Sequence, residues 1–373
     1  MTPTDYSNYF LHLFQEILLS INNEYLDNYD HLRFGPSDEK RSFSIKQNVR
    51  DKLHEKGYFH KSDATSVAGK IREAAWVRDF EYLYTILEDE DSQDLLIKIV
   101  VYRMLGHRKV KLPLSTPEYW ESIHQIESYQ SKEDVIQIDF MNYKLPLTDL
   151  FFLKVPLKLY YSAFGINIDF VIKQYEFHRN GVHIQAEEGE TVIDGGGCFG
   201  DTALYFADKI KTKGQAHVFE FIPDNISIFE KNIGLNPQVA PAIKLVKHPL
   251  WSHSDEEVFY QSNGPGSKVS FESFEGYSGK TSTLSIDDYA GREGLKRIDF
   301  IKMDIEGAEF KALQGAADTL KKHRPKLAIA LYHSTQDFEV IPRFLKELDL
   351  GYKFYLSHST IYGEETMLFA VAE

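Results

Sequence analysis

The stretch from Thr191 to Ala207, TVIDGGGCFGDTALYFA, has the pattern of a strand, a glycine turn and the start of a helix. Gly195, Gly197 and Gly200 fit the spacing G-x-G-x-x-G, in which glycines let a nucleotide lie against the backbone. Glu220 ends the next apolar run, about 20 residues after this loop. A carboxylate there can accept hydrogen bonds from both ribose hydroxyls. These residues together predict a nucleotide-binding site.

Asp194, directly before the first glycine, distinguishes two cofactors. A carboxylate at this turn would repel the pyrophosphate of a nicotinamide dinucleotide, whereas the ammonium and sulfonium of S-adenosylmethionine would be attracted to it. The methionine carboxylate can lie at the helix N-terminus beside Asp201 and Thr202, where backbone N–H groups accept anions. Asp201 is alternatively only an acid in the first turn of a helix. The turn therefore favours S-adenosylmethionine.

A second acidic site follows the apolar run in IDFIKMDIEGAEF, Ile298 to Phe310. Asp304, Glu306 and Glu309 come after this strand, at the switch point of a doubly wound sheet, where ligands bind. Their carboxylates can steer a sulfonium, hold a substrate hydroxyl or bind a metal. Glu306 and Glu309 are alternatively N-terminal acids of the next helix. We favour that alternative for Glu309 and a ligand role for Asp304.

An alcohol becomes a good nucleophile only when a base or a metal removes its proton. The candidate bases are Asp304, Glu306, His333 at the end of IALYH, and His358. We favour His333, with Asp304 second, because an unperturbed imidazole titrates near 6.5. No metal is expected, although the spacing of Asp304 and Glu306 does not discriminate. Trp251 is a candidate wall for the adenine, with core packing as its alternative.

These side chains need a sheet that brings strand ends together. Short apolar runs occur at TVID, AHVFEF, AIKLV, IDFIKM, KLAIALY, YKFYL and TMLFAVA. Helical patterns separate most of them, which predicts a mainly parallel sheet covered on both faces. Only SHSTIYGEE separates the last two runs, which is too short for a helical crossover, so they should pair antiparallel. This is the pattern of class I methyltransferases, a Rossmann-like fold.

The chain divides into three parts. Residues 1–134 are mostly helical, residues 135–190 contain linking strands and a helix, and residues 191–373 form the cofactor-binding domain. The first helix places Phe10, Phe14, Ile17, Leu18 and Ile21 on one face, for core packing or a dimer contact rather than a membrane surface.

Local patterns give three further expectations. A helix begins at Ser92 as its N-cap and ends at Gly106. DVIQIDFMNYKLP alternates like a strand, and IDFVIKQYEFHRNG is typical of a helix.

Composition limits the partners and the compartment. The net charge of −14 disfavours nucleic acid as a partner. Cys198 is the sole cysteine, which indicates a reducing compartment. No apolar run reaches a membrane span, and the first residues lack the pattern of a signal peptide. We therefore expect a cytoplasmic protein.

The segments VIDGGGCFGDTALYFA, VFEFIPDN, IDFIKMDIEGAEFKALQGA, KLAIALYH and ETMLFAVA occur in order. Together they resemble the FkbM family of S-adenosylmethionine-dependent methyltransferases, over roughly Tyr175 to Glu373. The resemblance implies O-methylation, often of sugar or natural-product hydroxyls. It also implies that Asp194, Gly195, Gly197 and Glu220 contact the cofactor.

Two positions depart from that family. Phe221 follows Glu220 where members commonly have proline, so the packing of the adenine against Phe221 can differ. Leu331 stands where many have a glutamate, which leaves His333 as the more prominent candidate on that strand. A nicotinamide-dependent oxidoreductase and a noncatalytic cofactor-binding or scaffold protein remain the alternatives.

Overall fold

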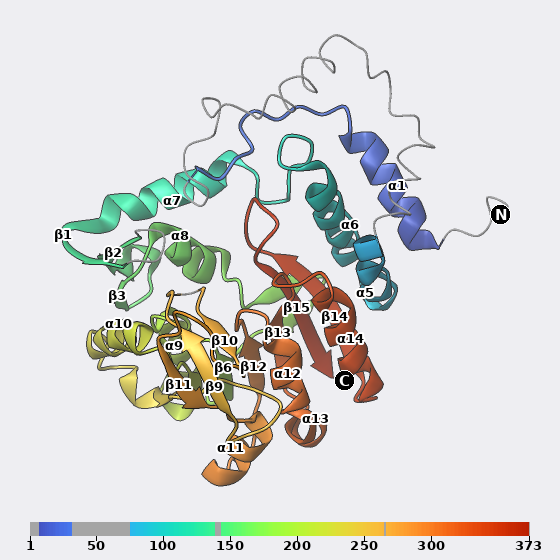
Figure 1. Cartoon of the computed structure of the whole chain (residues 1–373). Helices are drawn as coiled ribbons and strands as arrows, with labels where there is room; N and C mark the ends of the chain where they lie inside the picture. Colours follow the sequence, from blue (N-terminus) through green and yellow to red (C-terminus); the bar gives the residue numbers. More distant parts are fainter. Residues whose placement is uncertain (1–6, 32–74, 139–142, 265, 373) are drawn as a thin grey trace.

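The computed structural model describes residues 7–31, 75–138, 143–264 and 266–372 (Figure 1). Within these ranges the largest sheet has seven strands in the order β14-β15-β13-β12-β6-β7-β8. Their bounds are β6 Thr191–Gly195, β7 Gln215–Phe219, β8 Ile243–Val246, β12 Phe300–Met303, β13 Lys326–Ala330, β14 Tyr352–His358 and β15 Thr366–Ala372. β15 is antiparallel to both of its neighbours, and the pairs from β13 to β8 are parallel. The predicted strands and the class I methyltransferase fold are confirmed.

Both faces of this sheet are buried. Successive side chains of a strand point to opposite faces, and here each set packs into a different hydrophobic core. Ile193 and Ile301 belong to one hydrophobic core, and their neighbours Val192 and Phe300 belong to the other. Helices cover both faces, as predicted for a mainly parallel sheet (Figure 1). Their bounds are α9 Asp201–Ile210, α10 Pro223–Gly234, α11 Ile286–Glu293, α12 Glu309–Gln314, α13 Ala317–His323 and α14 Asp337–Glu347.

The N-terminal helices share a core with the sheet. They are α1 Asn8–Ser20, η2 Ala75–Phe80, α5 Glu81–Ile86, α6 Glu90–Leu105 and α7 Pro117–Tyr129. α1 buries Tyr9, Leu13 and Ile17, and Tyr9 donates a hydrogen bond to Val77 O at 2.7 Å. The predicted face was rotated from this one, since Leu18 is 45% exposed. The side of α1 that carries Tyr9 therefore faces the core and contacts the η2 backbone.

The N-cap of α6 is Asp89, so the prediction of Ser92 was wrong. Asp89 Oδ1 accepts from Ser92 N at 2.7 Å, which places Ser92 in the first turn. The Ser92 hydroxyl is within 3.1 Å of Asp89 Oδ2 and receives a hydrogen bond from Leu356 N of β14. The helix ends at Gly106 as predicted, with φ +81°. This cap joins α6 to the edge of the large sheet.

The segment before β6 departs most from the predictions. β1 Gln130–Gln137, β2 Lys144–Asp149 and β3 Lys158–Tyr160 form a small antiparallel sheet, and the predicted strand at residues 134–146 spans parts of β1 and β2. Residues 139–142 within it lie outside the described residues.

The helix predicted for IDFVIKQYEFHRNG is present only up to Ile172, and the prediction was wrong beyond that residue. Its beginning lies in a π-helical turn, η5 Asn167–Ile172, that ends at Lys173 with φ +60°. β4 Phe177–Arg179 then pairs with β5 Val182–Ile184.

Shorter elements complete the described fold. They are η4 Leu150–Leu153, α8 Ala163–Ile166, η6 Lys211–Lys213, η7 Ala240–Ala242, β9 Glu257–Gln261, β10 Lys268–Ser270 and β11 Gly279–Ser282. The last three strands form an antiparallel sheet that follows β8 in the chain. Among the described residues, no helix combines the length and apolar character needed to span a membrane.

Candidate functional site

A cavity of about 450 Å³ lies at the carboxyl ends of β6, β7, β8, β12 and β13. β6 and β12 are neighbours in the sheet, and the chain departs in opposite directions from this point, where doubly wound sheets bind ligands. The volume of the cavity is in the usual range for small-molecule pockets. The lining also includes Tyr161, Asp169 and Tyr175, which precede β6 in the chain. The segment before the cofactor-binding region therefore contributes to its pocket.

The glycine loop reaches the cavity through Gly196, whereas the predicted Gly195, Gly197 and Gly200 are not in the lining. Gly196 has φ +86°, and a Cβ there would lie 2.0 Å from Asp304 O, so the loops after β6 and β12 pack directly together. A Cβ on Gly197 would lie 2.2 Å from Val218 Cγ1. Two of these glycines thus permit close packing between strands and loops.

Asp194 is fully buried and does not line the cavity, which gives no support to its predicted contact with a cationic cofactor. Its Oδ1 lies 3.0 Å from Nζ of Lys302, and its Oδ2 accepts from the Thr202 hydroxyl at 2.6 Å. Lys302 Nζ also donates to the carbonyls of Gly195 and Gly196 at 2.9 and 2.8 Å. The charge of Asp194 is therefore balanced inside the protein. The sequence signal for this pair was a lysine inside an apolar strand.

Glu220 lies at the end of β7, 6% exposed and in the lining. Its Oε1 accepts from the backbone N–H groups of Phe221 and Ile222, both at 2.7 Å, and its Oε2 accepts from Asn225 Nδ2 at 3.2 Å. Burial raises the pKa of Glu220, and these hydrogen bonds oppose that rise. The bonds hold the carboxylate at the cavity wall, where it has lone pairs left for ribose hydroxyls.

Two aromatic residues predicted for the cofactor line the same cavity. The Phe221 ring meets the Tyr260 ring edge-on at 5.5 Å, and the Trp251 ring is tilted against the Phe271 ring at 5.1 Å. Both rings are partly exposed, which suits a wall that a planar ligand can cover.

Asp201 begins α9 and lines the cavity together with Thr202. Sequence reasoning did not find its partner Asp169, which forms a side-chain hydrogen bond with it. Burial first, and then the charge of Asp201, raise the pKa of Asp169 well above its usual range. Asp169 belongs to η5, in the segment for which a different structure was predicted.

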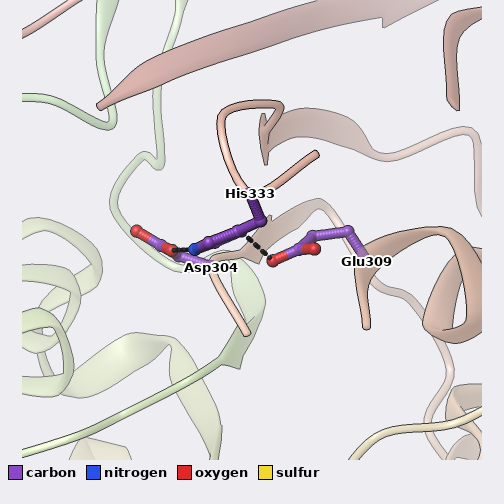
Figure 2. Close-up of side chains that lie close together, drawn as sticks. All are labelled: Asp304, Glu309 and His333. Atoms are coloured by element: carbon purple, nitrogen blue, oxygen red, sulfur yellow. Dashed lines mark ion pairs between the residues drawn. The ribbon is translucent and has the colours of Figure 1, made fainter. Parts of the chain in front are cut away.

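Asp304, Glu309 and His333 lie close together, as Figure 2 shows. His333 Nδ1 is 3.0 Å from Glu309 Oε1, and Nε2 is 3.6 Å from Asp304 Oδ1 and 3.9 Å from Glu306 Oε2. Burial alone lowers the pKa of His333, but Glu309, Asp304 and Glu306 together raise it to about 10. The imidazole is thus protonated at neutral pH. This argues against the predicted role of His333 as a base.

Asp304 follows β12 and faces the cavity. The Tyr332 hydroxyl donates to its two carboxylate oxygens at 2.9 and 3.0 Å, and the Tyr175 hydroxyl lies 3.4 Å from Oδ2. Burial and the charge of Asp304 raise the pKa of both tyrosines well above 10, so both remain donors. Asp304 is therefore a carboxylate oriented by two neutral hydroxyls beside one imidazolium.

One ligand atom from each of Asp304, Glu309 and His333 lies within 4.8 Å of the others, which is close enough for a common metal ion. Glu309 is fully buried and accepts from Ile305 N at 2.7 Å, so its role extends beyond a charge at the start of α12. The expectation that no metal binds here stays a prediction.

His358 does not line the cavity, so the structure gives no support to it as the base. Its Nδ1 lies 2.9 Å from Thr366 Oγ1, and burial lowers its pKa to about 4. It is a neutral histidine within the β14–β15 hairpin.

Comparisons with known proteins agree with this fold. Residues 194–354 match the family model described as the methyltransferase FkbM domain. The 2-O-methyltransferase NoeI of Sinorhizobium fredii is 26% identical over 165 residues, which are 39% of this chain and 65% of that protein. The crystal structure of methyltransferase FkbM from Methylobacillus flagellatus has a similar fold, with a TM-score of 0.50 and 17% identity over 88% of this chain and 71% of that one. Residues 194–354, which are less than half of the chain, therefore match a methyltransferase domain of the FkbM type, and the cofactor is S-adenosylmethionine.

Proposed function

We propose that this protein transfers a methyl group from S-adenosylmethionine to a hydroxyl oxygen of a sugar or another small biosynthetic intermediate. The observation that carries the proposal is the charge of the cavity. Its acidic lining residues are Asp169, Asp201, Glu220, Asp304, Glu306, Glu364 and Glu365, and its basic ones are Lys302, His248 and His333. This excess of carboxylates favours a cationic ligand and disfavours the pyrophosphate of a nicotinamide dinucleotide.

The lining fits S-adenosylmethionine in its hydrogen-bonding groups. Asp201 Oδ1 and Asn225 Oδ1 are buried acceptors without a hydrogen-bond partner among the described residues. The ligand brings donors of its own in the ammonium group, the ribose hydroxyls and the adenine amino group. Glu220 suits the ribose, and the rings of Phe221 and Trp251 suit the adenine. When bound, the cofactor supplies an electrophilic methyl group.

The chain's own contribution is alignment of the acceptor and removal of its proton. We assign proton removal to Asp304, since His333 is protonated at neutral pH and the carboxylate faces the cavity. Tyr332 holds Asp304 in one orientation through two short contacts. The imidazolium of His333 is close to the same carboxylate, and its positive charge offsets the negative charge of Asp304. Positioned reactants and a general base are the two devices that such a transfer needs.

Two observations support oxygen as the acceptor atom. The relative NoeI bears the name 2-O-methyltransferase, which supports the same reaction type here. The segment KMDIEGAE at the end of β12 contains no proline, whereas amino methylation of adenine or cytosine typically uses an Asp/Asn-Pro-Pro-aromatic turn at this place.

The test is methyl transfer from isotope-labelled S-adenosylmethionine to a panel of sugars and other hydroxyl compounds, each paired with its amino counterpart. Mass spectrometry and fragmentation locate the labelled methyl group. We expect label on oxygen, and we expect Asp304→Asn to abolish most of it while binding of S-adenosylhomocysteine persists. Label on nitrogen only, or turnover of NADH in place of methyl transfer, would contradict the proposal.

A further inference from the structure

Two carboxyl groups meet at the wall of the cavity. Asp169 of η5 and Asp201 of α9 are each 4% exposed, both line the cavity, and they share a side-chain hydrogen bond. Tyr161 lines the same wall of the cavity. Two carboxylates in contact within a buried site cannot both be ionised, so one proton is held between them. Burial and the charge of Asp201 raise the pKa of Asp169 well above its usual range, and burial raises the pKa of Asp201 as well.

The pair has acceptor atoms that nothing satisfies. Among the described residues, Asp169 Oδ2 and Asp201 Oδ1 have no hydrogen-bond partner. Gln174 lines the same cavity, is 2% exposed, and has its Oε1 without a partner as well. Buried acceptors without donors are costly and uncommon in folded proteins. Their gathering on one wall therefore indicates a ligand that brings donors.

The cation of this region is already engaged. Lys302 Nζ lies against Asp194 Oδ1 and donates to the carbonyls of Gly195 and Gly196. Two of the three N–H donors of this ammonium group go to these carbonyls, and its charge is paired with that of Asp194. Lys302 is therefore committed mainly to partners other than Asp169 and Asp201.

We propose that Asp169 and Asp201 together bind the α-ammonium group of the methionine moiety of S-adenosylmethionine. The inference rests on the cofactor of the proposed function and names the residues that recognise one end of it. On binding, the shared proton leaves to solvent and the ammonium takes its place between two carboxylates. Asp169 lies outside residues 194–354, so the segment before the FkbM domain completes the cofactor site.

Isothermal titration tests the assignment with two ligands, S-adenosylhomocysteine and its analogue in which hydrogen replaces the α-amino group. The wild-type protein should bind the parent about 10- to 100-fold more tightly, which is the range for hydrogen bonds to a charged group. Asp169→Asn and Asp201→Asn should remove most of this preference and leave the affinity for the analogue unchanged. Asparagine retains the size of the acid and, at position 169, can donate to Asp201 as the protonated acid does, so folding should persist.

Asp208→Asn is the matched control, because Asp208 is on the same helix α9 but outside the lining. It should keep the full preference. Titration in buffers of different ionisation enthalpy should show about one proton released per bound S-adenosylhomocysteine in the wild type and none in Asp169→Asn.

Equal wild-type affinity for the two ligands, or an equal loss of both in Asp169→Asn, would overturn the assignment. Preserved discrimination without transfer to any hydroxyl acceptor would support the assignment and contradict O-methylation alone.

Discussion

Lys302 Nζ and Asp194 Oδ1 are 3.0 Å apart, on side chains that are 1% and 0% exposed. The two residues face each other in the parallel register of β12 and β6, so the ion pair joins the two central strands at their carboxyl ends. Thr202 and two glycine carbonyls satisfy the remaining hydrogen-bonding groups. A charge pair this deep is structural, and removing one partner leaves the other buried and uncompensated.

Asp194→Asn should lower the free energy of unfolding by about 3–5 kcal/mol, the usual cost of breaking a buried ion pair. Denaturant titration measures it. The affinities for S-adenosylmethionine and for a neutral adenosine analogue should fall by similar factors, because the carboxylate lies outside the cavity.

The double variant Asp194→Asn, Lys302→Met supplies the control for this pair. It should lose less stability than the sum of the two single variants, because neither charge is then left alone. If Asp194→Asn lowered the affinity for S-adenosylmethionine but not for the neutral analogue, that result would support a direct contact between Asp194 and the cofactor's charge.

Glu220→Ala should weaken S-adenosylhomocysteine binding by about 1.5–3 kcal/mol, the range for a lost hydrogen bond to a charged group. Calorimetry on the folded variant measures this. Glu230→Gln on α10, an exposed side chain, is the control and should bind normally. Unchanged affinity in Glu220→Ala would remove Glu220 from the ribose site.

The seven-stranded sheet could be predicted because each strand is a short apolar run bounded by helical patterns. Glu220 and Trp251 could be placed at the pocket because they follow such runs. Lys302 could not be paired with Asp194, since that contact depends on the register of β12 against β6. The sheet was inferred from runs of apolar residues, and that pattern does not predict a buried lysine within a strand.

The other site residues that sequence reasoning missed depend on tertiary contacts. Asp169 lies on η5, which ends at Lys173 in a left-handed conformation, whereas the periodicity of that segment indicated a continuous helix. The charge of His333 depends on a fully buried Glu309 and on Asp304, which come from a different loop and helix. The residue type alone suggested an imidazole with the ordinary histidine pKa, and the surrounding carboxylates raise that pKa.

Removal of divalent metals should leave methyl transfer intact. The imidazolium of His333 already supplies a positive charge among Asp304, Glu306 and Glu309, so no ion is needed to balance them. Activity after exhaustive treatment with a chelator is the measurement. Loss of activity that magnesium restores, together with binding of magnesium abolished by Glu309→Gln, would identify these residues as a metal site.

The stability contributed by His333 should depend on pH. Its folded pKa of about 10 exceeds the unfolded value near 6.5, so protonation favours the folded state. The contribution is complete below pH 6.5 and is lost as pH rises towards 10. Denaturant titrations at intervals across this window should show a decline of a few kcal/mol in the wild type. His333→Gln should lack that decline, and an identical decline in both proteins would exclude His333 as its source.

Asp304 is the base in the proposed reaction. Asp304→Asn keeps the acceptor for the Tyr332 hydroxyl but removes the negative charge, so the rate of methyl transfer should fall by roughly 10²–10⁴-fold. The affinity for S-adenosylhomocysteine should change little, because the lost function is proton removal from the acceptor. Single-turnover rates and calorimetry separate these two effects.

His333→Gln is the companion variant for Asp304→Asn. If Asp304 is the base, the wild-type rate shows no rise through pH 6.5, since His333 stays protonated to about pH 10. A rate that rises through pH 6.5 and loses this step in His333→Gln would return the role to the imidazole. Near-normal turnover in Asp304→Asn would exclude Asp304 as the base, because no carboxylate at position 304 would then be needed to accept the proton.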